Sequence, residues 1–217
     1  PFSQYWQIER FKIYREDDAI RIYQNVFQFI STLLIVAVSG ISIFSDTIIR
    51  IMSPQEFHGA TIIVPFIAFA GLFSALTIFS NFSFLATNNT VWIAKSKYFL
   101  ACIFTALYLV LIPLLGYLGA AISLVLGQFT QFLIIHINSR KYYDMELKYK
   151  PLILMILFSL IGILIANTYI RDENLVAEFF FKLLVFSISS FLIVAIQLRN
   201  PMHKEYIFTA IRTHFKK

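Results

Sequence analysis

Six long apolar stretches constrain this chain more than any other feature of its sequence. They run approximately over residues 26–44, 60–80, 98–115, 119–137, 151–170 and 179–198. A transmembrane α-helix needs about 20 mostly apolar residues, and each stretch is close to that length. A composition of 59% hydrophobic and 14% charged residues leaves too little polar surface to cover a soluble globule of 217 residues. The sequence therefore predicts an integral membrane protein.

The apolar stretches have the pattern of helices rather than strands. In a membrane β-barrel, apolar and polar residues alternate in short segments because every strand has a lumenal face. The segment 151–166 (PLILMILFSLIGILIA) is instead apolar on all sides. A helix also satisfies its own backbone hydrogen bonds, as lipid requires. We predict an all-α polytopic bundle of about six transmembrane helices, part of a two-lobed transporter.

Three regions follow from this division. Residues 1–25 form a polar and aromatic amphipathic segment suited to the cytoplasmic membrane interface, or serve as a plain linker. Residues 26–198 form the six-helix bundle, and residues 199–217 form a basic tail. The chain starts with Pro1 rather than Met, so we expect a piece of a longer protein.

The distribution of Lys and Arg predicts the orientation in the membrane. Fifteen of the 18 lie in residues 1–25, 81–97, 138–150 and 199–217, which fall on one side. The alternate loops hold only Arg50 and Arg171, with Lys182 just inside the sixth span. Because cytoplasmic loops are enriched in Lys and Arg, both termini of this piece should be cytoplasmic. The positive charge thus reflects topology, and no nucleic-acid partner is expected.

Ionisable residues are missing from the centres of the predicted spans. Asp46, Glu178 and Lys182 lie within about a turn of span ends, with Lys182 the deepest. Lys182 either faces a polar cavity or anchors its helix at the interface. Cys102 is the single cysteine, expected to be buried, and the histidines are scattered. We therefore expect no disulfide, no metal, no cofactor and no enzymatic activity.

Uncharged polar side chains are more frequent within the spans. Such residues join neighbouring helices by hydrogen bonds in many membrane bundles, or they line a polar pathway. The uncharged candidates for a substrate pathway are Gln28, Asn81, Gln128 and Gln131. Lys182 is the charged candidate.

Residues 113–127 (PLLGYLGAAISLVLG) predict a tight helical hairpin. Pro113 and Gly116 end the third span, and about three residues turn the chain before the fourth begins. Gly119, Ser123 and Gly127 recur every four residues, so they share one helix face and allow close contact with a neighbouring helix. On this basis Gly127→Ala should be nearly neutral and Gly127→Leu disruptive. Pro65 is a further candidate for a hinge or packing position.

The stretch IPLLGYLGAAISLVLG resembles the P-x-x-G-x-x-G-A-A hairpin of the MOP flippase superfamily, in particular its Wzx-type polysaccharide flippases. Residues 54–60 (PQEFHGA) are similar to a short external segment of that family. Residues 95–97 (KSK) are similar to its basic loop. One departure is visible, because the glycine usual before the basic pair is replaced by Asn88 and Asn89.

The resemblance implies a transporter of two six-helix bundles, often with two extra C-terminal helices. This piece would supply the last four helices of the second bundle and the extra pair, or the whole second half of a twelve-helix protein. Such proteins move polyprenyl-diphosphate-linked oligosaccharides across the bacterial inner membrane by alternating access. These repeat units serve O-antigen (lipopolysaccharide), capsule or exopolysaccharide synthesis. The implied partners are this lipid-linked substrate, membrane lipids, the missing N-terminal helices and the polysaccharide polymerase machinery.

Three other classes remain open at this stage. A MATE-like cation-coupled drug antiporter has the same superfamily fold, but it should carry an ionisable residue inside its lobe. A membrane glycan polymerase or ligase should have a sizeable external loop, whereas the predicted loops are short. A purely structural membrane subunit is the third.

Overall fold

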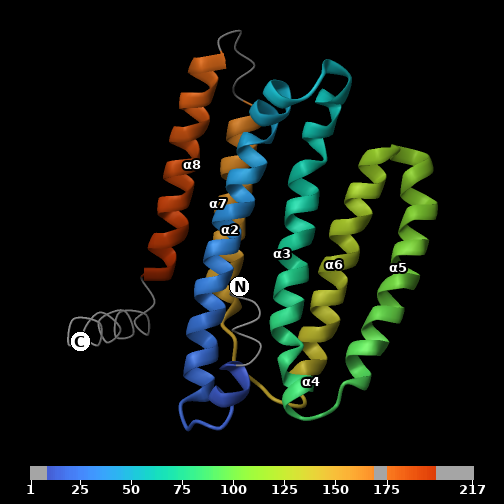
Figure 1. The fold of residues 1–217 in the computed structure, drawn as a ribbon, viewed down its shortest axis with the longest axis vertical. Coiled ribbons are helices and arrows are strands. Elements are labelled where there is room, and N and C mark those ends of the chain that lie inside the picture. Colours follow the sequence, from blue (N-terminus) through green and yellow to red (C-terminus); the bar gives the residue numbers. More distant parts are fainter. Residues whose placement is uncertain (1–8, 169–174, 199–217) are drawn as a thin grey trace. The chain divides into compact units, whose positions relative to one another are not determined.

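The computed structural model describes residues 9–168 and 175–198, and in those residues all regular structure is helical (Figure 1). Six of the helices are long and apolar enough to cross a membrane. The predicted all-α membrane bundle is confirmed. Residues 9–13 form a short helix. The other elements, in chain order, are α2 (Ala19–Met52), the 3₁₀ helix η1 (Gln55–Ile62), α3 (Val64–Ser80), α4 (Phe82–Ala86), α5 (Val91–Leu115), α6 (Tyr117–Ser139), α7 (Tyr149–Thr168) and α8 (Leu175–Leu198).

Two helices extend well beyond the apolar stretches that predicted them. Helix α2 has 34 residues where the sequence predicted 26–44, which corresponds to about 51 Å at 1.5 Å per residue. Helix α5 begins at Val91, so Lys95 and Lys97 lie on its first turns rather than in a loop. Charged side chains near a helix end can reach the interface, so the end of an apolar run does not end the helix.

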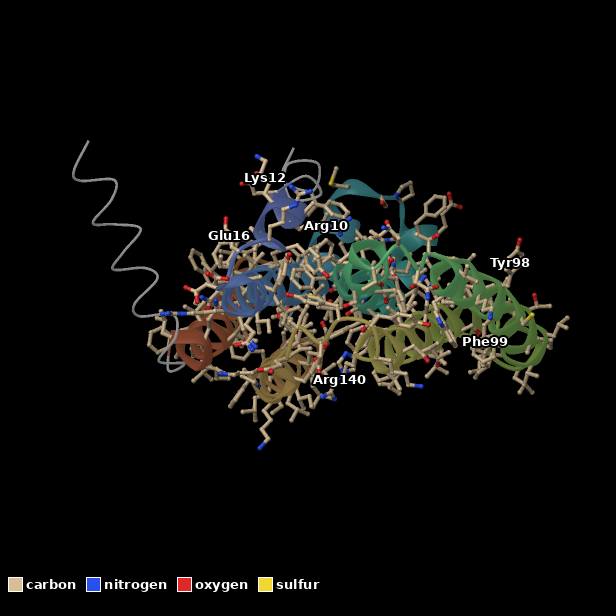
Figure 2. All side chains as sticks on the ribbon, turned by 90° about the horizontal axis from the view of Figure 1, so that it is seen from below. Arg10, Lys12, Glu16, Tyr98, Phe99 and Arg140 are labelled. Atoms are coloured by element: carbon tan, nitrogen blue, oxygen red, sulfur yellow. The ribbon has the colours of Figure 1, made fainter. Side chains whose placement is uncertain are left out.

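The chain forms two compact units, of which the first comprises residues 9–23 and 48–147. In it, α6 packs between α3 and α5 (Figure 1). The Phe73 ring of α3 lies 5.0 Å from the Phe129 ring of α6, centroid to centroid. Helix α5 is covered on one side only, with Ser96 and Leu100 as its buried residues. Tyr98 and Phe99 project from its outer side (Figure 2).

The exposure of α5 corrects one expectation from the sequence. Cys102 lies on this helix and is exposed, not buried among apolar residues. Its apolar neighbours reflect contact with lipid or with other helices rather than with a core of this chain.

The second unit comprises residues 24–47 of α2 together with α7 and α8. Small residues bring its helices together. The Ser39 and Ser159 hydroxyl oxygens are 2.6 Å apart and join α2 to α7. A Cβ added at Gly162 would lie 3.1 Å from the Ser189 Cβ of α8, and one added at Gly40 would lie 3.2 Å from the Phe186 ring. Even an alanine at either glycine would require its neighbour to shift by a few tenths of an ångström.

The ends of the helices in the first unit follow the charge pattern. Residues 9–17, 87–90 and 140–147 lie at one end, and η1 and the turn between α5 and α6 lie at the other (Figure 1). The first end carries most of the basic side chains of this unit: Arg10, Lys12, Arg15, Lys95, Lys97, Arg140 and Lys141. Arg171 and the basic tail 199–217 lie outside the described residues. The arrangement is compatible with a cytoplasmic first end.

We expect single cysteines introduced after residues 50, 90, 117, 145, 173 and 217 to be labelled from outside, inside, outside, inside, outside and inside, respectively. The measurement uses a membrane-impermeant maleimide on intact cells. Cys102→Ser provides the background, because Cys102 is exposed and is the single cysteine. The reason is the charge asymmetry between alternate loops. Labelling of position 145 from outside would contradict this orientation.

Candidate functional site: the hairpin and the polar residues of the spans

The α5–α6 hairpin is tighter than the sequence predicted. Helix α5 ends at Leu115 and α6 begins at Tyr117, so Gly116 alone connects them. Its φ is 58° and its ψ is −133°, a conformation that residues with a Cβ rarely adopt. Its amide donates to the Ile112 carbonyl at 2.8 Å, and Pro113 lies within the last turn of α5. The turn therefore requires glycine at position 116.

Gly119, Ser123 and Gly127 lie on a buried face of α6. A Cβ added at Gly119 would lie 2.0 Å from the Leu111 carbonyl oxygen of α5. One added at Gly127 would lie 2.1 Å from Cε1 of Phe104. The Ser123 hydroxyl donates a hydrogen bond to the Gly119 carbonyl of the same helix at 2.7 Å, so its polar group is satisfied within α6. Helix α5 therefore packs against this face so closely that positions 119 and 127 have no room for a Cβ unless α5 or the Phe104 ring moves.

Two expectations about single residues change with this geometry. Gly127→Ala is not a neutral change, because even a methyl group overlaps the Phe104 ring unless that ring rotates away. Pro65 lies in the first turn of α3. Proline suits this position because the amide there has no partner within the helix. Pro65 therefore begins a helix and is not a hinge inside one.

Asn88, in the loop before α5, has a φ of 55°. Asparagine adopts this left-handed conformation more readily than most residues that carry a side chain. The loop before α5 therefore keeps a backbone conformation that glycine also favours.

Three of the pathway candidates lie in the first unit and have buried polar atoms without a hydrogen-bond partner. These atoms are Oδ1 of Asn81, Oε1 of Gln128 and Nε2 of Gln131. Gln131 is 2% exposed. A buried amide group without a partner costs several kcal/mol in an apolar medium, so water, a ligand or a further helix must complete these sites. These three amides, together with Ser80 Oγ and Arg10 Nε, are described polar groups of this unit with unused binding capacity.

Gln28, in the second unit, has a structural partner. Its side-chain nitrogen donates to the Lys148 carbonyl at 2.6 Å and ties α2 to the start of α7. One turn along, the Thr32 hydroxyl lies 3.4 Å from the Met155 sulfur. These bonds match the general role of polar residues between membrane helices.

Lys182 lies in a buried charged cluster with Glu178, Asp46 and Thr47. Its Nζ lies 2.5 Å from Oε1 of Glu178, 3.5 Å from Oδ2 of Asp46 and 3.1 Å from Oγ1 of Thr47. Lys182 is 1% exposed and Glu178 is 2% exposed. Lys182 is therefore not an anchor that reaches the interface. Its ammonium is already paired, so it does not offer a free cation to a diphosphate.

The cluster joins α8 to α2 through the contacts of Lys182 with Asp46 and Thr47. Oε2 of Glu178 is buried and accepts no hydrogen bond. Sequence reasoning placed these residues separately near span ends and missed their association. The spacing of Glu178 and Lys182, four residues apart on one helix, was the available signal. Asp46 was not predictable in this way, because it lies on another helix.

The described His, Cys, Asp and Glu residues form no metal-binding cluster. In the part of the chain that the structure describes, no group of three or more His, Cys, Asp and Glu side chains has the geometry to hold a metal ion. The chain matches no family model, no curated protein and no solved structure. The hairpin, the partnerless amides and the charged cluster are therefore the features on which a function must rest.

Proposed function

We propose that this chain is the C-terminal part of a transporter that flips polyprenyl-diphosphate-linked oligosaccharides across the bacterial inner membrane by alternating access. The observation that carries the proposal is the hairpin of residues 113–127. Its sequence resembles that of the polysaccharide flippases, and its geometry explains why glycine is required at Gly116 and Gly119. The motif is thus tied to a specific backbone arrangement rather than to composition alone.

Two further features support a carrier of an amphiphilic substrate. The polyprenyl tail needs an apolar surface that stays in the membrane, and α5 exposes most of its apolar side chains. The sugar needs polar groups that accept or donate hydrogen bonds, and the buried amides of Gln128 and Gln131 have unused capacity. The first unit therefore offers the two kinds of surface that such a substrate requires.

A MATE-like cation-coupled antiporter is the second candidate, and one observation favours it. Glu178 is a buried carboxyl group with one oxygen free of hydrogen bonds. Ionisable groups buried in membrane bundles commonly mark ion or proton pathways. The pairing of Glu178 with Lys182 is equally suited to a static bridge, so the flippase remains the proposal.

Deletion of the complete gene tests the proposal. We expect surface polysaccharide to disappear and undecaprenyl-linked repeat units to accumulate on the cytoplasmic side, with recovery on re-expression of the full-length protein. Normal export with altered polymer length would indicate a polymerase or ligase instead. Unchanged polysaccharide with altered resistance to cationic drugs would indicate the antiporter.

A further inference from the structure

Arg10 is a buried cation without a counter-ion among the described residues. It is 7% exposed, and its Nε has no hydrogen-bond partner. Within residues 9–168 and 175–198, no carboxylate forms an ion pair with it. Lys182, the other deeply buried cation, contacts two carboxylates. Arg10 therefore differs from Lys182 in having its charge uncompensated.

The Arg10 guanidinium lies against two aromatic rings. Its carbon lies 5.1 Å from the Phe82 ring centroid and 5.6 Å from that of Phe11. Such contacts contribute roughly 0.5–2 kcal/mol, whereas burying an unpaired charge costs several kcal/mol. Burial also lowers the pKa of the guanidinium from its ordinary value, with the Tyr23 hydroxyl acting in the opposite direction. The rings alone do not offset this cost, whereas an anion at the guanidinium would.

The surroundings of Arg10 fix its backbone and include two exposed aromatic rings. The Tyr23 hydroxyl donates to the Arg10 carbonyl at 2.5 Å and fixes the backbone. Phe11 is 44% exposed and Tyr14 is 37% exposed. Figure 2 shows Arg10 and Lys12 on the same side of the first unit. Exposed aromatic rings beside basic residues are typical of the headgroup region of a membrane.

We infer that the Arg10 guanidinium, packed against the rings of Phe11 and Phe82, binds a phosphate group at the membrane face expected to be cytoplasmic. Arginine suits this role because its planar fork of donors matches phosphate oxygens. The phosphate belongs either to an anionic lipid headgroup or to free phosphate. This site includes neither Gln128 nor Gln131, the amides proposed for transport, and its existence does not depend on the flippase assignment.

Binding by the full-length protein in detergent micelles tests the inference, with dihexanoyl phosphatidylglycerol and inorganic phosphate as the two probes. We expect saturable binding whose Kd rises about tenfold or more in Arg10→Gln, because hydrogen bonds to charged groups are strong. Arg15→Gln removes the same charge from an exposed position in the same segment, and its Kd should stay within about twofold of the wild type. Tighter binding of the lipid than of phosphate identifies a headgroup site, and equal binding identifies a free phosphate site.

Thermal unfolding separates loss of binding from loss of folding. Without a ligand, Arg10→Gln should be as stable as the wild type, because the substitution removes an unpaired buried charge. The rise in Tm that the bound probe gives the wild type should be absent in this variant. Absence of saturable binding of either probe to the wild type would overturn the inference. Equal weakening in the Arg10 and Arg15 variants would also overturn it.

Discussion

Gly119→Ala should destabilise the protein by about 3 kcal/mol, at the upper end of the usual cost of overpacking a core. The added methyl group would lie 2.0 Å from the Leu111 carbonyl oxygen. Because this atom belongs to the backbone of α5, no side-chain rotation relieves the overlap and the two helices must separate. Denaturation of the purified full-length protein in mixed micelles measures the effect.

Gly71→Ala is the matched control for this substitution. Gly71 lies inside α3, and a Cβ added there meets nothing within 4 Å. Its stability should stay within about 0.5 kcal/mol of the wild type, as for surface changes generally. Equal stability of the Gly119 and Gly71 variants would show that α5 and α6 do not approach each other as described.

Lys182→Met should cost about 3–5 kcal/mol, the usual result of removing one partner from a buried ion pair. The substitution leaves the carboxylates of Glu178 and Asp46 close together without their shared cation. Lys97→Met is the control, because Lys97 is exposed on the first turns of α5. It should change stability by less than about 0.5 kcal/mol.

A double substitution distinguishes the ion pair from simple packing. Lys182→Met combined with Glu178→Gln removes both charges and should recover part of the stability lost in Lys182→Met. If Glu178→Gln instead adds its own full cost to that of Lys182→Met, the two side chains do not interact as described. The same pair of variants, assayed for transport, reports whether the cluster also has a role in ion coupling.

The six spans were predictable because lipid imposes a length and an apolar character that any reader of the sequence can measure. The bounds of the helices were less predictable. Helix α5 continues through Lys95 and Lys97 because long basic side chains reach the interface without ending a helix. The hairpin was predictable from its proline and glycines, but its single-residue connection at Gly116 was not.

The candidate site was also predictable only in part. Polar residues within the spans were visible in the sequence, but their partners depend on contacts between distant segments. Gln28 bonds to a carbonyl 120 residues away. Lys182 bonds to Thr47 across a separation of 135 residues. The setting of Arg10 likewise depends on Phe82 of α4, which no spacing in the sequence connects to it.

Transport by the full-length protein in proteoliposomes tests the central claim most directly. Vesicles with a polyprenyl-diphosphate-linked oligosaccharide restricted to one leaflet are mixed with an impermeant glycosidase on the opposite side. If the protein is a flippase, the oligosaccharide should become accessible in its presence and remain protected in empty vesicles. Equal protection with and without the protein, in vesicles shown to hold it folded, would contradict the proposed function.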